Sequence, residues 1–230
     1  FPYTTLFRSF KKVQKQTVSY MTIEEVKLLL SIPDQSDTRQ LRDLAILTFL
    51  YDTAARVQEL LDFTPAHFRK GKNTVAELHG KGNKTRLVPI SPDAAAIIQE
   101  YMKRSKRNDL HAPLFVNKKG EKLTRAGIQY IIDKYVTLAR GKEPGMFREK
   151  ITNHSFRHSK AMHLLESGVN LIYIRDILGH TSVITTEVYA RSNPKIKEEQ
   201  ILKHGADIAP KTKYSEQEKE DLLNWLKTHI

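Results

Sequence analysis

The chain has 230 residues and no cysteine. Without thiols it can form no disulfide bond, no cysteine-ligated zinc site and no cysteine nucleophile. It also lacks any apolar run approaching the roughly 20 residues that span a bilayer. Its start shows no basic segment followed by an apolar run, which would be typical of a signal peptide. These absences exclude a thiol enzyme and fit a protein of a reducing cytoplasm.

The sequence also lacks a starting methionine. Residues Phe1–Ser9 can be encoded by the codons of a common short-read sequencing adapter. We therefore expect residues 1–9 to be non-native and leave them out of the reasoning about the fold. Finding the same codons at the intact genomic locus would contradict this expectation. Residues 10–19 are short, basic and without a hydrophobic period, and we interpret them as a linker.

Acidic residues are scarce relative to basic ones. The 26 Asp and Glu stand against 38 Lys and Arg, which gives a formal net charge of +12. A surface this basic favours a polyanionic partner, and duplex DNA is the densest common polyanion. Charge alone does not identify the partner, so particular residues have to.

Apolar spacing predicts a mainly helical chain with one β-hairpin. Residues 74–79 and 85–90 have strand character and enclose a Gly-Lys-Gly-Asn-Lys turn. Helices and strands do not alternate as a doubly wound sheet requires, so we expect a mainly α fold with a small antiparallel β-sheet (α+β). Caps, periodicity and stop signals place helices at 23–30, 41–56, 57–63, 93–105, 124–140, 154–166, 170–178, from 181 or 182 through Tyr189, and at 193–205, with a brief extended piece at 114–117.

The last 25 residues, 206–230, form a separate segment in this interpretation. A polar stretch leads into an amphipathic helix, and that helix either packs against its own domain or docks on a neighbouring subunit. The residues of its apolar face are Leu222, Leu223, Trp225, Leu226 and Ile230.

Two arginines have the chemistry to act on a phosphodiester. That bond resists attack because its oxygens are negative and its leaving alkoxide is poor, so a site needs cations, a nucleophile and an acid. Arg56, in TAARVQEL, and Arg157, in NHSFRH, are the candidate cations, since a guanidinium can bind two phosphate oxygens and stays charged. The alternative for Arg56 is a structural ion pair with Glu59.

Lys81 lies in the Gly-Lys-Gly turn of the predicted hairpin. From such a tip its side chain could reach into a DNA groove and protonate a leaving 5′ oxygen. The alternative is an ordinary exposed turn lysine. The segment GKGNKT does not fit a nucleotide-binding phosphate loop, because its glycine spacing differs from GxxxxGK[ST] and a strand follows it instead of a helix.

His154 and Arg157 are three residues apart on one predicted helix, so they share a face. This spacing places a proton acceptor beside a phosphate-binding group. His154 and His158 have the spacing of paired zinc ligands, but Ser155 stands where a zincin needs glutamate, so we expect no metal there. We interpret His158 and His163 as packing or helix-surface residues.

His180 follows the helix-stopping Gly179 in ILGH, a turn where its imidazole could donate to a phosphate oxygen. Tyr189, nine residues later, could be a nucleophile, provided that nearby cations favour ionisation of a phenol with a pKa near 10. Taken singly, Tyr189 would be a half-buried helical tyrosine. Together with the other five residues it indicates a site that acts on phosphodiesters.

In this order and spacing, the six residues resemble the active site of the tyrosine recombinase (phage integrase) family. The resemblance runs from Tyr20 to Gly205, and its most specific stretches are NHSFRHSKAMHLLESGV and ILGHTSVITTEVYA. It implies the family's catalytic-domain fold over residues 20–205 and site-specific recombination or integration of DNA. The TAAR turn departs from the family mildly, since many members have glycine second. We also expect the N-terminal core-binding domain to be missing, with residues 10–19 as the linker from it.

The resemblance implies a mechanism. Tyr189 would attack the scissile phosphate to give a 3′-phosphotyrosine and a free 5′ hydroxyl. No metal or nucleotide cofactor would be needed, because the phosphotyrosine keeps the bond energy for rejoining. The remaining roles fall on Arg56, Arg157 and His180 as stabilisers of the pentacoordinate phosphate, on Lys81 as general acid and on His154 as general base or proton shuttle, with Glu59 in support.

Members of the family act as homotetramers on two DNA duplexes and often exchange C-terminal helices. The resemblance therefore implies double-stranded DNA and further copies of the chain as partners, in the cytoplasm at a prokaryotic nucleoid. Two alternatives stay open: a non-catalytic DNA-binding protein that retains the fold, and a strand-relaxing enzyme like a type IB topoisomerase. The products formed from two-site substrates would separate the recombinase from the relaxing enzyme.

Overall fold

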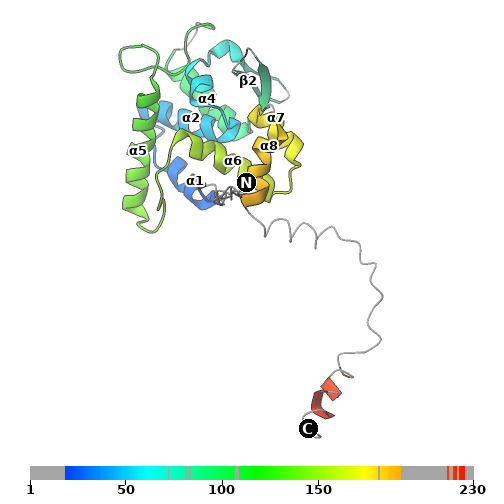
Figure 1. Cartoon of the computed structure of the whole chain (residues 1–230). Coiled ribbons are helices and arrows are strands. Elements are labelled where there is room, and N and C mark those ends of the chain that lie inside the picture. Colours follow the sequence, from blue (N-terminus) through cyan, green and yellow to red (C-terminus); the bar gives the residue numbers. More distant parts are fainter. Residues whose placement is uncertain are drawn as a thin grey trace, which may run out of the picture. The chain divides into compact units, whose positions relative to one another are not determined.

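The computed structural model describes residues 19–71, 73–80, 82, 84–106, 109–180, 182–192, 217, 220–221 and 223–225. The chain divides into two units, Phe1–Ile196 and Lys197–Ile230. The first is mainly helical with one small sheet, as predicted (Figure 1). Its elements are α1 Ile23–Ser31, α2 Thr38–Thr53, α3 Val57–Leu61, the 3-10 helix η1 Pro65–His67, β1 Phe68–Arg69, β2 Val75–His79, β3 Thr85–Pro89, α4 Pro92–Arg104, α5 Arg125–Lys142, α6 Asn153–Glu166, α7 Leu171–Leu178 and α8 Val183–Ser192.

Several helices begin at capping residues that the sequence predicts. Thr22 and Glu25 form a reciprocal box at α1: the Glu25 N–H donates to Thr22 Oγ1 at 3.1 Å and the Thr22 N–H to Glu25 Oε2 at 2.8 Å. At other helices a single side-chain oxygen accepts a backbone N–H of the first turn. The predicted caps of this kind are Ser91 at α4, Thr124 at α5 and Ser182 at α8. Asn170, which the sequence predicts as the first residue of its helix, caps α7.

Helix α2 ends earlier than predicted. The sequence favours a helix through Arg56, but α2 stops at Thr53 and Ala54 takes a left-handed conformation with φ 51°. A left-handed alanine is uncommon, because its Cβ crowds the next carbonyl, and so no residue type in TAAR signals the break. Arg56 consequently leaves the buried helix and becomes the residue just before α3.

The predicted hairpin is present as β2 and β3, which pair antiparallel with Leu78 opposite Arg86. A strand of two residues, β1, adds to the other edge of β2 and was too short to be predicted. Ala76 and Leu78 of β2 are fully buried, so one face of the sheet packs on the helical core. The extended piece expected at 114–117 forms an isolated bridge between Val116 and Lys122.

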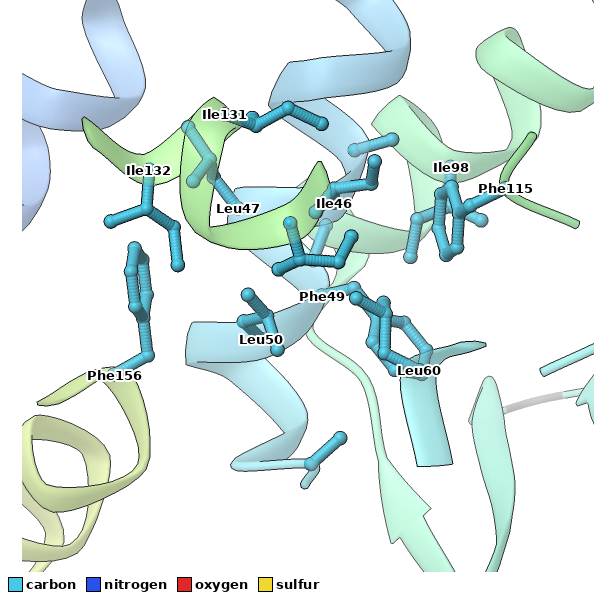
Figure 2. Close-up of a cluster of buried hydrophobic side chains, with 14 of the residues drawn as sticks. Ile46, Leu47, Phe49, Leu50, Leu60, Ile98, Phe115, Ile131, Ile132 and Phe156 are labelled. Carbon is cyan, nitrogen blue, oxygen red and sulfur yellow. The ribbon is translucent and has the colours of Figure 1, made fainter. Parts of the chain in front are cut away.

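Helix α2 is the centre of the core. Its side chains at Ile46, Leu47, Phe49 and Leu50 are fully buried, as the apolar sequence predicts, and it packs against α4 and α6. Each such side chain contributes roughly 1.5–3 kcal/mol through burial. Figure 2 shows these residues with the surrounding buried side chains Leu60, Ile98, Phe115, Ile131, Ile132 and Phe156.

A smaller apolar cluster attaches the last two helices of the first unit. Helix α8 packs against α6 and α7, and α7 also contacts β3 (Figure 1). This packing brings residues from the hairpin, from α6 and from the chain after α7 to one place. The buried members of the cluster are Ala54, Ala161, Met162, Ile174, Leu178 and Tyr189.

Some predictions concern residues that the structure does not describe. They are the segment 1–9, residues 10–18 of the linker, Lys81 and the helix at 193–205. In the second unit, residues 217, 220–221 and 223–225 are helical, and the Leu223 and Trp225 side chains are exposed. Within the described residues, every helix is too short or too polar to span a bilayer.

Candidate active site

A cavity of about 630 Å³ opens between the β2–β3 hairpin and the end of α7. It contains two of the predicted site residues and more basic than acidic side chains. Its lining consists of Arg56, Gly80, Gly82, Lys84, Thr85, Arg86, Asp176, Gly179, His180 and Thr185.

The C-terminal end of α7 gathers three arginines beside this cavity. Arg86 donates to the carbonyl of residue 177 at 2.8 Å, Arg157 to that of residue 178, and Arg56 to that of residue 179 at 3.3 Å. The last carbonyls of a helix have no intrahelical partner and carry the negative end of the helix dipole. One helix end therefore holds guanidinium groups that come from β3, from α6 and from the start of α3.

Arg56 is also held by Glu59. Its Nη1 donates to Glu59 Oε1 at 3.0 Å, and its backbone N–H donates to Oε2 at 2.7 Å. The structural ion pair, which the sequence offered as an alternative to a phosphate-binding role, is thus present. The Arg56 side chain nevertheless remains 37% exposed and lines the cavity, so the ion pair leaves it accessible to a ligand.

Arg86 is a site residue that sequence reasoning misses. Its Nη1 and Nη2 donate to the two oxygens of Glu59 at 2.7 and 2.8 Å. Burial raises the pKa of Glu59, but the hydrogen bonds and charges of Arg86 and then Arg56 outweigh it, so the net pKa is lowered and the carboxylate is charged. Glu59 lies 27 positions before Arg86, and no local pattern links the two.

Arg157, on α6, is a buried cation. Its side chain donates to the Ala54 carbonyl at 2.8 Å, and the residue is 4% exposed. Burial, followed by the charges of Arg56 and Arg86, lowers its pKa to about 10. The guanidinium therefore stays charged at pH 7, and a bound anion would relieve the repulsion among the three arginines.

His180 sits directly after Gly179, the left-handed residue (φ 62°) that ends α7 as predicted. Its Nδ1 lies 3.0 Å from the hydroxyl of the buried Thr186. Burial, then the charges of Arg157 and Arg56, lowers the pKa of His180 to about 4, so the imidazole is neutral at pH 7. When the Thr186 hydroxyl donates to Nδ1, the proton is on Nε2, where it is available to a ligand oxygen.

Tyr189, on α8, is 3% exposed, and its hydroxyl lies 2.9 Å from Nδ1 of His158. Burial raises the pKa of this phenol, against the opposing effect of the Arg157 charge. At pH 7 the group is neutral, so it needs a proton acceptor before it can attack.

His158, which the sequence predicts to be a packing or helix-surface residue, is half-buried and contacts the Tyr189 hydroxyl. His154, which the sequence favours, is exposed one helical turn earlier, and its ring centre lies 6.3 Å from that of His158. The interpretation of His163 is confirmed: it is buried, with Nδ1 2.9 Å from the Tyr51 hydroxyl.

Lys81 itself lies outside the described residues, but its neighbours Gly80 and Gly82 line the cavity. Lys84, on the same hairpin turn, also lines it. The hairpin thus faces the same cavity as Arg56 and His180. Among the described residues, no group of three or more His, Asp or Glu side chains is arranged to hold a metal ion.

The arrangement has the chemistry to bind a phosphate and attack it. Arg56 and the neutral imidazole of His180 line the cavity and can contact non-bridging oxygens, and the buried Arg157 adds a positive charge beside them. The Tyr189 hydroxyl has a base in hydrogen-bond contact. Such preorganised donors favour a transition state in which negative charge accumulates on phosphate oxygens.

Known proteins are similar to this chain in sequence. The model of the phage integrase family matches residues 19–195. A putative integrase/recombinase, y4rC of Sinorhizobium fredii, is 32% identical over 193 residues, which cover 84% of this chain and 58% of that protein. The tyrosine recombinase XerD of Chlorobaculum tepidum is 35% identical over 185 residues, which cover 77% of this chain and 59% of that protein.

Solved structures show the same fold. The XerH site-specific recombinase bound to its difH substrate, in a pre-cleavage complex, superposes with a TM-score of 0.68 at 25% identity. The match covers 84% of this chain and 55% of that one. The chain spans about three fifths of the length of the curated relatives, at 58% and 59% of the two compared.

Proposed function

The chain belongs to the phage integrase family, and we propose on this premise that it is a site-specific DNA recombinase. It would cut and rejoin DNA strands through a 3′-phosphotyrosine intermediate. The observation that carries the proposal is the convergence of Arg56, Arg157 and His180 at the end of α7, with the Tyr189 hydroxyl on the neighbouring helix.

In the proposed reaction, Arg56 and Arg157 bind the non-bridging oxygens of the scissile phosphate, and His180 donates a hydrogen bond from Nε2. Tyr189 attacks the phosphorus. Lys81, at the hairpin turn, protonates the leaving 5′ oxygen. His154, exposed on α6, acts as a proton shuttle between the site and solvent.

Ionisation of the attacking Tyr189 phenol is the difficult step. Ionising Tyr189 is unfavourable in the free protein, because burial raises its pKa. The positive charges at the end of α7 favour the phosphorane, which carries more negative charge than the ground state. The phosphotyrosine bond retains the energy for rejoining, so we propose that the reaction needs neither metal ion nor nucleotide cofactor.

For partners, we propose double-stranded DNA and further copies of this chain. A related recombinase forms a complex with its DNA substrate, and the net charge of +12 suits a polyanion. We further propose a homotetramer that holds two DNA sites, with the C-terminal helix docked on a neighbouring subunit, at the nucleoid of a prokaryotic cell.

The test is covalent capture on a pool of nicked duplexes that carry a randomised segment beside the nick. Cleavage next to the nick releases a short fragment, which leaves the chain on the 3′ end in a complex that survives denaturing electrophoresis. The full chain should form this adduct in EDTA. The Tyr189→Phe variant should form none, whereas Tyr173→Phe, a change at an exposed tyrosine on α7, should react like the unmodified chain.

The other outcomes identify the alternatives. Binding of the pool with no adduct would show a DNA-binding protein without catalysis and refute the proposal. An adduct that gives relaxed circles, but no recombinant products from a two-site substrate, would indicate a strand-relaxing enzyme. An undiminished adduct in Tyr189→Phe would exclude Tyr189 as nucleophile.

A further inference from the structure

We propose that His158 is a catalytic residue that accepts the phenolic proton of Tyr189 as the tyrosine attacks the scissile phosphate. The inference rests on the proposed function and assigns its proton acceptor to a residue that the sequence predicts to be a packing or helix-surface residue. The geometry that carries it is the 2.9 Å contact between His158 Nδ1 and the Tyr189 hydroxyl.

The contact is between side chains held on two packed helices. His158 lies on α6 and Tyr189 on α8, and the two helices pack against each other in the apolar cluster. The ring centres are 5.7 Å apart, with the ring planes inclined by 56°. A proton transfer requires a donor and an acceptor within about 2.6–3.2 Å, and this pair satisfies that distance before DNA binds.

His158 is also in the protonation state that a base needs. Burial, followed by the positive charges of His154 and Arg157, lowers its pKa below the usual value for histidine. The imidazole is therefore neutral at pH 7, and with its proton on Nε2 its Nδ1 lone pair faces the phenol. In this tautomer the proton can move along the existing hydrogen bond.

The alternative acceptor, His154, lies one helical turn before His158 on the same face of α6. It is exposed, and its ring lies 6.3 Å from that of His158. Among the described residues, the hydrogen-bond partner of the Tyr189 hydroxyl is His158. His154 can therefore relay a proton from His158 towards solvent, whereas direct transfer from Tyr189 would require the tyrosine to move.

The Tyr189 oxygen forms a bond to phosphorus while the bond from phosphorus to the 5′ oxygen breaks. The phenolic proton moves to Nδ1 of His158, which becomes an imidazolium. The leaving 5′ oxygen takes a proton from the general acid, assigned to Lys81. Rejoining reverses each transfer, so His158 returns its proton to the tyrosine.

A simple structural role for His158 would be to satisfy the hydrogen bond of a buried phenol. The variant His158→Asn separates the two roles, because its amide oxygen can occupy the place of Nδ1 and accept the same hydrogen bond but cannot take up the proton. We expect His158→Asn to bind DNA normally and to form the covalent adduct at least about 100-fold more slowly in single-turnover experiments.

The matched comparison is His154→Asn, at the exposed histidine of the same helix face, which should lose less rate than His158→Asn. A duplex with sulfur in place of the bridging 5′ oxygen adds a second readout, because thiolate leaves without protonation. With this substrate, the rate of adduct formation by Lys81→Ala should rise. The rate deficit of His158→Asn should stay unchanged.

Several results would overturn the assignment. A rate for His158→Asn within about threefold of the unmodified chain would reduce His158 to a packing residue. If the sulfur substrate restored the rate of adduct formation by His158→Asn, His158 would act in protonation of the leaving group. If the unmodified chain forms no adduct, the proposed function fails and this inference fails with it; an active chain with an active His158→Asn refutes this inference alone.

Discussion

Glu59 holds two of the three arginines of the site. Its carboxylate accepts hydrogen bonds from Arg86 and Arg56 at once and is 3% exposed at the side chain. A buried carboxylate with two guanidinium partners is compensated, but each partner would be a poorly compensated cation without it. The charge of Glu59 therefore determines both the stability of this region and the position of Arg56.

We expect Glu59→Gln to lower the free energy of unfolding by about 3 kcal/mol, the usual cost of removing one partner of a buried ion pair. Urea denaturation at pH 7 measures the change. Adduct formation should fall as well, because Arg56 loses the partner that orients it.

The matched control for that experiment is Glu100→Gln. Glu100 pairs with Arg104 on α4 at 2.6 Å, but both side chains are substantially exposed, at 42% and 37%. Exposed pairs contribute about 0–1 kcal/mol, so this variant should stay close to the unmodified chain. Equal losses in the two variants would contradict the importance of burial at Glu59.

His180 predicts a pH dependence of stability. Its folded-state pKa is about 4, whereas the unfolded chain has a pKa of about 6.5. Between these values the unfolded chain binds the additional proton, so the free energy of unfolding falls as the pH is lowered from 7 through 6.5 towards 4. Its full contribution is present above about pH 6.5.

Urea denaturation between pH 7 and 5 tests this expectation. The groups that lower the pKa through their charge are Arg157 and His158 on α6, Arg56 at the start of α3 and Arg86 on β3. Replacing His180 by Gln removes the titration, so the variant should lose less stability over this range than the unmodified chain. Parallel pH curves for the two proteins would show that His180 is not the titrating group.

At the scale of elements, the end of α7 organises the site. Three consecutive carbonyls receive three arginines, and the residue that ends the helix, Gly179, is left-handed and packed against Arg86. The helix must end at that residue for the three carbonyls to be accessible. Its termination is thus as important for the chemistry as any single cation.

The variant Gly179→Ala tests this role. The new Cβ would lie 3.0 Å from Cδ and Nη1 of Arg86, and φ would stay at 62°. We expect a loss of about 1 kcal/mol from the left-handed alanine. Displacement of Arg86 should also slow adduct formation. Calorimetric melting measures the loss of stability, and quenched time courses measure the rate of adduct formation.

Gly120→Ala is the control for the backbone effect alone. Gly120 has φ 82°, and nothing lies within 4 Å of the position of its Cβ. It should lose similar stability and retain full activity. Equal activity in both variants would show that Arg86 does not need its present position.

The helices and strands are more predictable from the sequence than the contacts between them. Thr22 and Ser91, together with the few residues that follow each of them, predict where α1 and α4 begin, and Gly179 predicts the end of α7. The end of α2 at Thr53 was missed, because a left-handed Ala54 has no marker in the sequence.

The candidate site shows the same division. The sequence identifies Arg157 and Tyr189 by local motifs, and in the structure the two are close enough for the Arg157 charge to act on the pKa of the phenol. It misses His158, since the contact with Tyr189 joins positions 31 apart and depends on how α8 packs against α6. Arg86 was missed for the same reason, because its partners are on α3 and α7. Local sequence patterns do not predict contacts between elements that are far apart in the chain.

At the scale of the whole molecule, the excess of basic residues predicts binding that depends strongly on salt. The net charge is +12, and the cavity adds Lys84 to its arginines. Each phosphate neutralised on binding releases condensed counterions, so the affinity for duplex DNA should fall on the order of 10³-fold between about 50 and 200 mM salt if about six phosphates are contacted. Fluorescence anisotropy with a labelled duplex gives this dependence as the slope of log Kd against log salt.

A single cation of the cavity should contribute to that slope in a way that a remote one does not. Lys84 lines the cavity, so Lys84→Ala should weaken binding and reduce the magnitude of the slope by about 1, the value for one phosphate contact. Lys27, exposed on α1, provides the control, and Lys27→Ala should leave the slope unchanged. The two variants carry the same net charge, so a difference between them reports position and not total charge. Identical slopes for Lys84→Ala and the unmodified chain would mean that the DNA backbone does not enter the cavity between the hairpin and the end of α7.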